Sequence, residues 1–403
     1  MSPTAAAREG RSFALRVSLL FAAIFLVAGT SLPYLPVWLD WAGLGPREIA
    51  IITAAPLLVR VAVTPVIAMA ADRAGDHRRF LIGLSWVGLA ALIALAQARG
   101  FWPILGCILL FALAWTTVMP LTETVAMSGV RAVGLDYGRM RLWGSLSFIA
   151  ASLYGGWVVQ EMGPASAVWL IVAGMALTTA AAHGLARPTG LGRLEAATSP
   201  PRLELAGALG LLRSRIFLVF LLATGAVQAA HAVLYTFGTL HWRALGLSTA
   251  WCGTLWAVGI VAEVGLFAHS RAVVARVGAV ELIVLGAAAA LLRWLAMGFD
   301  PPLALLVGLQ VLHALTYGAA HLGAIHFMAR AVPEVQAGTA QALYASVTGG
   351  IAMGGAMLAA GPLYANFGGR AYWAMAALAA VALAASLALQ RTRADHERSW
   401  RGQ

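Results

Sequence analysis

The chain has 403 residues, of which 61% are hydrophobic and only 11% are charged, and its mean hydropathy is +0.83. Soluble domains average about 25% charged residues, so this composition excludes an ordinary soluble protein. The net charge of +11 comes from arginines scattered over short segments, which is unlike the single basic stripe of a nucleic-acid-binding protein. We therefore predict an integral membrane protein that does not bind nucleic acid.

Apolar runs long enough to cross a bilayer follow one another along the whole chain. A crossing helix needs about 20 such residues, and the alternating pattern of a membrane barrel is missing, so we predict an all-α membrane protein. The first run is too long for a signal-peptide core and is interpreted as a retained helix. Twelve transmembrane helices are expected near residues 13–38, 47–71, 80–98, 102–128, 139–160, 164–186, 214–240, 248–269, 279–298, 302–329, 336–362 and 370–390.

The arginines predict the orientation of these helices, since the chain contains no lysine. Twenty-one arginines fall in the two termini, the central polar segment and the loops that follow even-numbered helices, against four in the other loops. Cytoplasmic loops carry an excess of positive residues, so both termini are predicted to be cytoplasmic. We expect a multi-pass protein of the cell inner (plasma) membrane, in contact with the lipid bilayer.

The longest polar stretch divides the chain into two halves. We predict an N-terminal six-helix bundle over 1–186, a cytoplasmic linker over 187–213 and a C-terminal six-helix bundle over 214–403. Each half has a short basic segment after its second helix, at 71–80 and at 269–279. A repeated six-helix unit is typical of secondary transporters, whose site lies near the bilayer midplane.

This architecture resembles the major facilitator superfamily. The stretch AMAADRAGDHRR (68–79) is similar to the loop motif of that family: Asp72, Arg73 and Gly75 match, whereas Ala68 replaces the first glycine and the basic pair comes late. The resemblance implies that the three matching residues belong to a cytoplasmic gate. The alternative is that these charges only fix the topology.

Ionisable residues inside the predicted helices are candidates for the transport site, because a charge at the bilayer centre costs about 2.5–3.5 kcal/mol and is a functional-site signal. Glu123 and Arg141 lie equally far from the middle of the loop that joins their helices. The same symmetry relates Glu263 to Arg293, and Arg293 to His313. Antiparallel helices therefore bring each pair to about the same depth.

Arg60 matches the depth of Glu263 in the equivalent helix of the other half. Three arginines against two glutamates leave a surplus positive charge, which suits an anionic ligand. The alternative is that the Glu–Arg pairs are purely structural. Gln228 and His231, one turn apart, could hydrogen-bond the ligand or be satisfied by neighbouring helices.

A closer resemblance rests on PLTETVA followed by LDYGRMRLWGS (residues 120–126 and 135–145), which is similar to a segment of the galactoside–proton symporters. That resemblance implies substrate binding by Glu123 and Arg141. It also implies proton coupling by the set Glu263, Arg293 and His313. In two places this chain departs from those symporters: Thr316 stands where they carry a protonatable Glu, and Gln310 where they carry Lys. Either Glu263 or His313 then carries the proton.

The same segments resemble still more closely the 3-phenylpropionate transporter family. The stretches concerned are PLTETVA, LDYGRMRLWGSLSF, VGIVAEVGLFA (258–268), LHALTYGAAHLGAIHFMAR (312–330) and LLVRVAVTP, which contains Arg60. This resemblance implies proton-coupled uptake of an aromatic carboxylate. An arginine can hold a carboxylate bidentately, and Arg60 would balance the acids or reach the carboxylate.

No cofactor or metal is expected, and a proton gradient is the predicted energy source. His313, His321 and His326 lack the regular spacing of one metal-binding face, and no phosphate-binding loop for ATP is present in the sequence. We predict a secondary active transporter, functional as a monomer and not an enzyme, that takes up a small organic anion with protons by alternating access. The alternatives are a proton symporter of a neutral sugar or nucleoside, an exporter, and a non-transporting membrane receptor.

Overall fold

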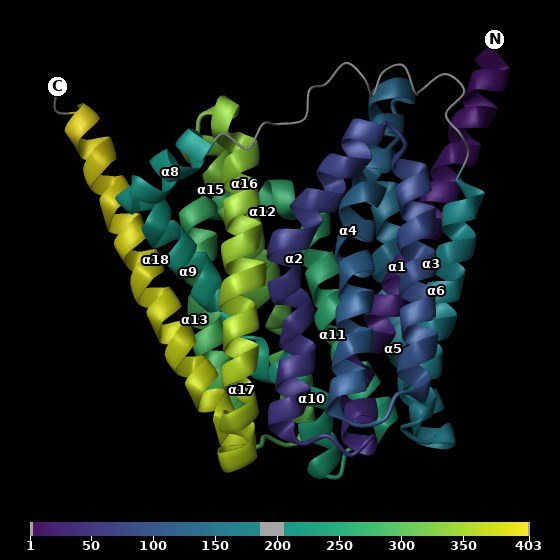
Figure 1. Cartoon of the computed structure of the whole chain (residues 1–403). Coiled ribbons are helices and arrows are strands. Elements are labelled where there is room, and N and C mark those ends of the chain that lie inside the picture. Colours follow the sequence, from purple (N-terminus) through teal and green to yellow (C-terminus); the bar gives the residue numbers. More distant parts are fainter. Residues whose placement is uncertain (1–2, 186–204, 402–403) are drawn as a thin grey trace. The chain divides into compact units, whose positions relative to one another are not determined.

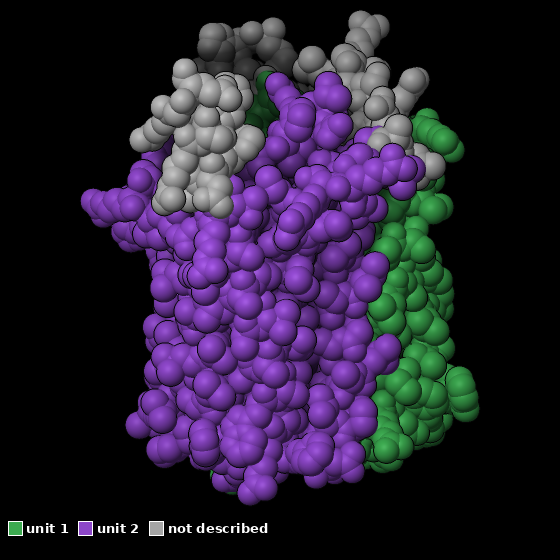
Figure 2. Space-filling view, turned by 90° about the vertical axis from the view of Figure 1, so that its left-hand side faces the viewer, with its two compact units in different colours: residues 1–200, 246–257 green, residues 201–245, 258–403 purple. Residues whose placement is uncertain are grey.

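The computed structural model describes residues 3–185 and 205–401, and no β-strand occurs in that part of the chain (Figure 1). Eleven helical segments there are long and apolar enough to cross a membrane. Two compact units are formed, one by residues 1–200 with 246–257 and the other by 201–245 with 258–403, shown in green and purple in Figure 2. The division predicted at 187–213 stays a prediction, since residues 187–204 of that linker lie outside the described residues.

Unit 1 consists mainly of six long helices. They are α1 (Pro3–Trp41), α2 (Pro46–Ala74), α3 (His77–Gln97), α4 (Phe101–Val133), α5 (Tyr137–Met162) and α6 (Ser166–Gly184). Helix α1 packs along α5 and α6, while α4 packs along α2 and α3. Hydroxyl groups of α5 fix the contact with α1: Ser147 donates to the carbonyl of Ala22 at 2.8 Å, and Ser152 to that of Gly29 at 3.2 Å. Such side-chain hydrogen bonds between helices are a known means of association in lipid.

Unit 2 contains more and shorter elements. They are α8 (Leu205–Arg213), α9 (Arg215–Ala229), α10 (Ala232–Ala244), α11 (Thr249–Ala268), α12 (Ser270–Val277), α13 (Ala279–Met297), α14 (Leu303–Val311), η1 (Ala314–Ala319), α15 (Ala320–Ala331), η2 (Glu334–Gln336), α16 (Ala337–Tyr344), η3 (Ala345–Ala352), α17 (Met353–Phe367), η4 (Gly368–Arg370) and α18 (Ala371–Arg401). Helix α11 belongs to unit 1 up to residue 257 and to unit 2 from residue 258. Helix α13 packs against α15, η1 and α18.

Three of the predicted helices are not regular α-helices. The segment predicted at 214–240 is interrupted between α9 and α10, and those at 302–329 and 336–362 contain the π-helical segments η1 and η3. Isolated π turns inside α-helices are rare and frequently mark functional sites. The sequence pattern of apolar residues predicts the length of these segments and does not reveal the widened turns.

The end of α6 is held by two arginines from other helices. Arg78 of α3 donates to the carbonyl oxygens of Leu185 at 2.7 Å and His183 at 3.0 Å, and Arg16 of α1 donates to that of Gly184 at 2.7 Å. The last carbonyl groups of a helix have no partner within it, so cationic side chains can satisfy them. These contacts join α1, α3 and α6 at one end of unit 1.

Replacing Arg78 should therefore destabilise unit 1. Arg78→Ala removes two charge-assisted hydrogen bonds, and we expect the free energy of unfolding to fall by about 1–2 kcal/mol. Arg79→Ala is the matched control, because Arg79 is 73% exposed and pairs only locally with Asp76 at 2.9 Å; its effect should stay within about 0.5 kcal/mol. Denaturation in mixed micelles measures both values, and equal losses would contradict this account.

Candidate functional site

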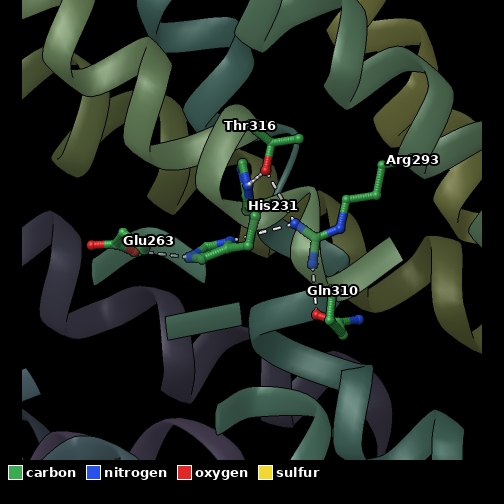
Figure 3. Close-up of polar contacts among 6 residues, drawn as sticks. His231, Glu263, Arg293, Gln310 and Thr316 are labelled. Atoms are coloured by element: carbon green, nitrogen blue, oxygen red, sulfur yellow. Dashed lines mark hydrogen bonds and ion pairs between the residues drawn. The ribbon is translucent and has the colours of Figure 1, made fainter. Parts of the chain in front are cut away.

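Arg293 of α13 is the centre of a polar cluster inside unit 2 (Figure 3). Its side chain is completely buried, with 0% exposed. One terminal nitrogen, Nη2, donates to Oε1 of Gln310 at 2.6 Å, and the other, Nη1, lies 3.1 Å from Oγ1 of Thr316 and 3.4 Å from Nδ1 of His313. The guanidinium carbon also lies 4.6 Å from the ring centroid of Trp294. Three acceptors from one chain segment therefore surround a single buried cation.

The position of η1 explains how one segment supplies all three acceptors. In a regular α-helix, residues six apart such as 310 and 316 point about 120° away from each other. The π turn begins directly after His313 and changes that angle, so that Gln310, His313 and Thr316 all contact Arg293. Helix α13 can approach η1 because Gly286 has no side chain: a Cβ there would lie 2.9 Å from the carbonyl oxygen of Leu315.

The hydrogen bonds of Arg293 determine the form of His313. An arginine only donates, so Nδ1 of His313 must accept and carries no proton. The proton of the neutral imidazole is then on Nε2, which lies 3.3 Å from Oε2 of Glu263 and faces that carboxylate. Arg293, His313 and Glu263 thus form a chain of donors and acceptors with one direction.

A second branch leads from Arg293 through Thr316 to His231. Nδ1 of His231 lies 3.1 Å from the carbonyl oxygen of Val227 and 3.3 Å from that of Gln228, so it must be the protonated nitrogen. Nε2 of His231 then accepts from the hydroxyl of Thr316 at 3.0 Å, while that hydroxyl accepts from Arg293. Both branches are therefore polarised outward from the cation.

This arrangement distributes a charge that would be very costly if it were isolated. A buried ion persists only when it is paired and hydrogen-bonded. Glu263 supplies the opposite charge at the end of one branch, where its side chain is 16% exposed. Within the described residues, Nε of Arg293 and Nε2 of Gln310 have no hydrogen-bond partner. Aromatic rings enclose the cluster: Trp294 lies edge-on to His231 at 5.1 Å, and Tyr317 stacks on His313 at 5.4 Å.

In unit 1, Tyr137 lies between the predicted substrate residues Glu123 and Arg141. Its hydroxyl donates to Oε1 of Glu123 at 3.4 Å, and its side chain also interacts with Arg141. The guanidinium of Arg141 lies over the ring of Phe25, 4.1 Å from its centroid, and 5.8 Å from that of Phe21. Arg141 is half-buried, in contrast to Arg293. Glu123 and Arg141 thus meet through a tyrosine and not as a direct ion pair.

The remaining predicted site residues are Arg60, Gln228, Asp72, Arg73 and Gly75. Arg60 is half-buried on α2, and Gln228 is buried at the end of α9, where its backbone carbonyl accepts from His231. Asp72 is bonded to His77 at 2.8 Å, Arg73 is exposed, and Gly75 ends α2 in a left-handed conformation with φ of 63°. Their predicted roles in substrate binding and in a cytoplasmic gate stay predictions.

Gln310, Thr316 and Tyr137 contact the predicted site residues and were not predicted to belong to the site. Gln310 and Thr316 lie three residues before and after His313, and Tyr137 lies one turn before Arg141. The sequence signal that could have identified them is a polar side chain three or four residues from a predicted site residue on an otherwise apolar helix. No group of three or more His, Cys, Asp or Glu able to hold a metal ion is found in the part of the chain that the structure describes.

Comparison with known proteins identifies the family. The model of the MFS_1 like family matches residues 14–375. The chain belongs to this family. It is therefore a member of the major facilitator superfamily, as the sequence predicted.

The relatives to which this chain is similar are named as transporters of several substrates. The chain is 32% identical to the probable 3-phenylpropionic acid transporter of Escherichia coli K12, with 89% of this chain and 93% of that protein covered. It is 31% identical to the maltose permease of Geobacillus stearothermophilus, with 83% of each covered. It is 26% identical to the putative nucleoside transporter YegT of Escherichia coli K12, over 64% of this chain and 61% of that protein.

Solved structures show the same fold. The crystal structure of the nucleoside transporter NupG superimposes with a TM-score of 0.81 at 17% identity, covering 94% of this chain and 98% of that one. A bacterial homologue of the lysosomal transporter Spinster gives a TM-score of 0.69 at 15% identity, covering 97% and 98%. At these identities, the likeness concerns the fold alone. The MFS_1 like chain is thus a helical, multi-pass membrane protein whose relatives are transporters.

The hydroxyl of Thr316 should be essential to the Arg293 cluster. Thr316→Val keeps the shape of the side chain but leaves Nε2 of His231 without its donor and Arg293 without one acceptor, which should lower the free energy of unfolding by about 1–3 kcal/mol. Thr316→Ser, the control, retains the hydroxyl and should lose less than half as much. Denaturation in mixed micelles gives both values; a valine variant as stable as the serine variant would refute the assigned hydrogen bonds.

Proposed function

We propose that this protein is a proton-coupled transporter that takes up a small aromatic carboxylate by alternating access. The observation that carries the proposal is the buried path from Arg293 through His313 to Glu263. Well-packed apolar residues stabilise a fold as well as buried ionic groups do, so folding does not require this path. Ionisable residues inside membrane helices are functional candidates by default. The path would serve to transmit a change in the protonation of Glu263 to Arg293.

Arg141 is the group best suited to bind the carboxylate. The terminal nitrogens of Arg293 are occupied by three side chains and fully buried. The guanidinium of Arg141 instead lies with its flat face against Phe25 and also contacts Tyr137. Its other in-plane N–H groups are suited to hold a carboxylate bidentately. Phe25 and Phe21 then supply apolar surface beside the charge. The 32% identical relative named for 3-phenylpropionic acid supports an aromatic acid as the substrate.

Glu263 is the group best suited to carry the proton. A second proton on His313 would have to sit on Nδ1, where it would face the donating Arg293. Glu263 can take a proton on the oxygen that His313 does not contact and still accept from His313 on the other. Protonation of Glu263 removes the counter-charge of Arg293, so the cluster must rearrange or the substrate anion must compensate. That linkage would couple the movement of the proton to the movement of the substrate anion.

We further propose twelve crossings, with both termini in the cytoplasm of a cell whose inner (plasma) membrane holds the protein as a functional monomer. The last candidate span, Glu334–Thr392, has 59 residues; at about 1.5 Å per residue a straight helix would be roughly three times as long as the hydrocarbon core is thick. The turn η4 divides this segment, which supports two crossings. The arginine distribution supports the orientation, and Asp72, Arg73 and Gly75 then lie on the cytoplasmic side as the proposed gate.

A second candidate function is proton-coupled transport of a neutral sugar or nucleoside. The 31% identity to the maltose permease favours it, and Glu123 with Tyr137 offers an acceptor and a hydroxyl that could hydrogen-bond sugar hydroxyl groups. Inhibition of uptake by sugars and not by aromatic acids would support this candidate. Export in place of uptake remains an alternative direction of the same cycle, because gradients set the direction of an alternating-access transporter.

Arg141 should determine the affinity for the acid. In proteoliposomes with acid outside, Arg141→Gln should raise KM for 3-phenylpropionate by about 10–100-fold, because one charge-assisted bidentate pair is lost; Arg141→Lys, which keeps the charge but not the fork, should fall between. Arg139→Gln is the matched control on the same helix, since Arg139 is 88% exposed and pairs only with Asp136. If the glutamine variants at 139 and 141 behave alike, Arg141 does not bind the acid.

Glu263 should be required for coupling but not for exchange. Glu263→Gln keeps an acceptor for His313 and cannot be deprotonated, so accumulation driven by a pH gradient should be lost while counterflow of labelled against unlabelled acid is retained. Glu334→Gln, an exposed change in the same unit, should leave both unchanged. Gradient-driven accumulation by the Glu263→Gln variant at the wild-type level would assign the proton to another residue.

A further inference from the structure

Unit 2 contains a second histidine–carboxylate pair, to which the proposed function assigns no role. Nε2 of His241, at the end of α10, lies 2.7 Å from Oδ1 of Asp300 in the connection between α13 and α14. The imidazole is almost completely buried, with 8% of the side chain exposed, whereas 44% of the Asp300 side chain is exposed. The carboxylate thus links the buried ring to solvent.

The backbone around Asp300 is arranged for this contact. Asp300 is the only residue other than glycine with positive φ, at 51°, in the described chain, a conformation that aspartate tolerates at a small cost in energy. The pair lies directly against Gly369 of η4, where a Cβ would come 2.6 Å from Nε2 of His241. One imidazole therefore joins α10, the α13–α14 connection and η4.

The other ring nitrogen faces a hydroxyl group. Nδ1 of His241 lies 3.3 Å from the hydroxyl oxygen of Tyr364 in α17, and the ring of Tyr364 is stacked on Phe237 at 4.4 Å with an angle of 4° between the planes. Because aspartate accepts, Nε2 carries the proton and Nδ1 accepts from the tyrosine hydroxyl. A hydroxyl can also accept, so its direction is reversible.

We propose that His241 is a second proton-binding site of this protein, separate from the Arg293 cluster. A proton from solvent binds to Nδ1 and gives an imidazolium; the Tyr364 hydroxyl turns from donor to acceptor, and the Nε2 bond to Asp300 becomes an ion pair. No heavy-atom contact is lost. His313 cannot respond in this way, because its Nδ1 faces an arginine that can only donate. The two histidines differ because Nδ1 of His241 faces the hydroxyl of Tyr364, whereas Nδ1 of His313 faces Arg293.

The groups that face His241 allow this change. They are Asp300 from the α13–α14 connection, Tyr364 from α17, and Tyr372 from α18, whose ring centroid lies 6.1 Å from that of His241. Arg243 of the same helix is half-buried. Arg370 of η4 lies over Trp373, 6.0 Å from its ring centroid. The charge on His241 therefore adjusts how firmly three chain segments are held together. Under the proposed orientation, this end of unit 2 faces the outside.

Nitrogen NMR of the full-length protein in proteoliposomes, labelled with 15N at the histidine rings, tests the proposal without any substrate. Ring nitrogen shifts distinguish the two neutral tautomers from the imidazolium. As the pH is lowered, we expect the His241 signal to pass from the Nε2-protonated form to the doubly protonated form. A His241 signal that stays neutral throughout, or that shows the Nδ1-protonated tautomer, would overturn the proposal.

Variants assign the signal and test the neighbours. His241→Gln should remove the titrating signal, and His269→Gln, an exposed change in the same unit, should leave it unchanged. Asp300→Asn and Tyr364→Phe should each move the titration midpoint to lower pH, because each removes a group that stabilises the imidazolium; they also assign the signal if the variant at 241 does not fold. A midpoint insensitive to both would contradict the assigned contacts. Loss of transport coupling has no bearing on this result, so the two proposals fail independently.

Discussion

The interior of unit 2 is organised by one constraint: a completely buried arginine must keep its charge without contact with water. Guanidinium groups do not lose their proton in proteins, so the surroundings of Arg293 must supply acceptors and a counter-charge. The α14–η1 segment supplies the acceptors Gln310, His313 and Thr316, and α11 supplies the carboxylate of Glu263. His231 in turn accepts from Thr316. The break between α9 and α10, the π turn η1 and the close approach at Gly286 all occur where these side chains converge.

The arginines at the centres of the two units, Arg141 and Arg293, have different surroundings, which favour different roles. Arg141 is half-buried, lies flat on Phe25 and reaches Glu123 only through Tyr137. Arg293 has its donors occupied and reaches Glu263 through a histidine with a fixed tautomer. The first arrangement leaves an arginine available to an anion, and the second makes the charge of a carboxylate matter to a buried cation. The proposed substrate binding by Arg141 and the proposed proton binding by Glu263 rest on these environments.

The sequence predicted the long helices well, because apolar runs of bilayer length dominate the chain, but it did not predict the short helices α8 and α12 or the π turns. Equal distances along the chain from the connecting loops predicted that Glu263, Arg293 and His313 lie at one depth. In the structure, His313 contacts both Arg293 and Glu263. Depth alone does not give the direction of a side chain around its helix axis. The contacts of Gln310 and Thr316 depend on that direction, which the π turn alters. The pair of His241 with Asp300 was not predicted, since the two residues belong to different helical connections and no motif joins them.

In the proposed mechanism, Glu263 gains and loses the transported proton while His313 stays neutral. Infrared difference spectroscopy of the purified protein, recorded on addition of 3-phenylpropionate, reports directly on carboxyl groups that change protonation. We expect a carboxyl band that appears or disappears when the acid binds, and that is missing in the Glu263→Gln variant. A spectrum with no carboxyl change, or a band that persists unchanged in that variant, would contradict it.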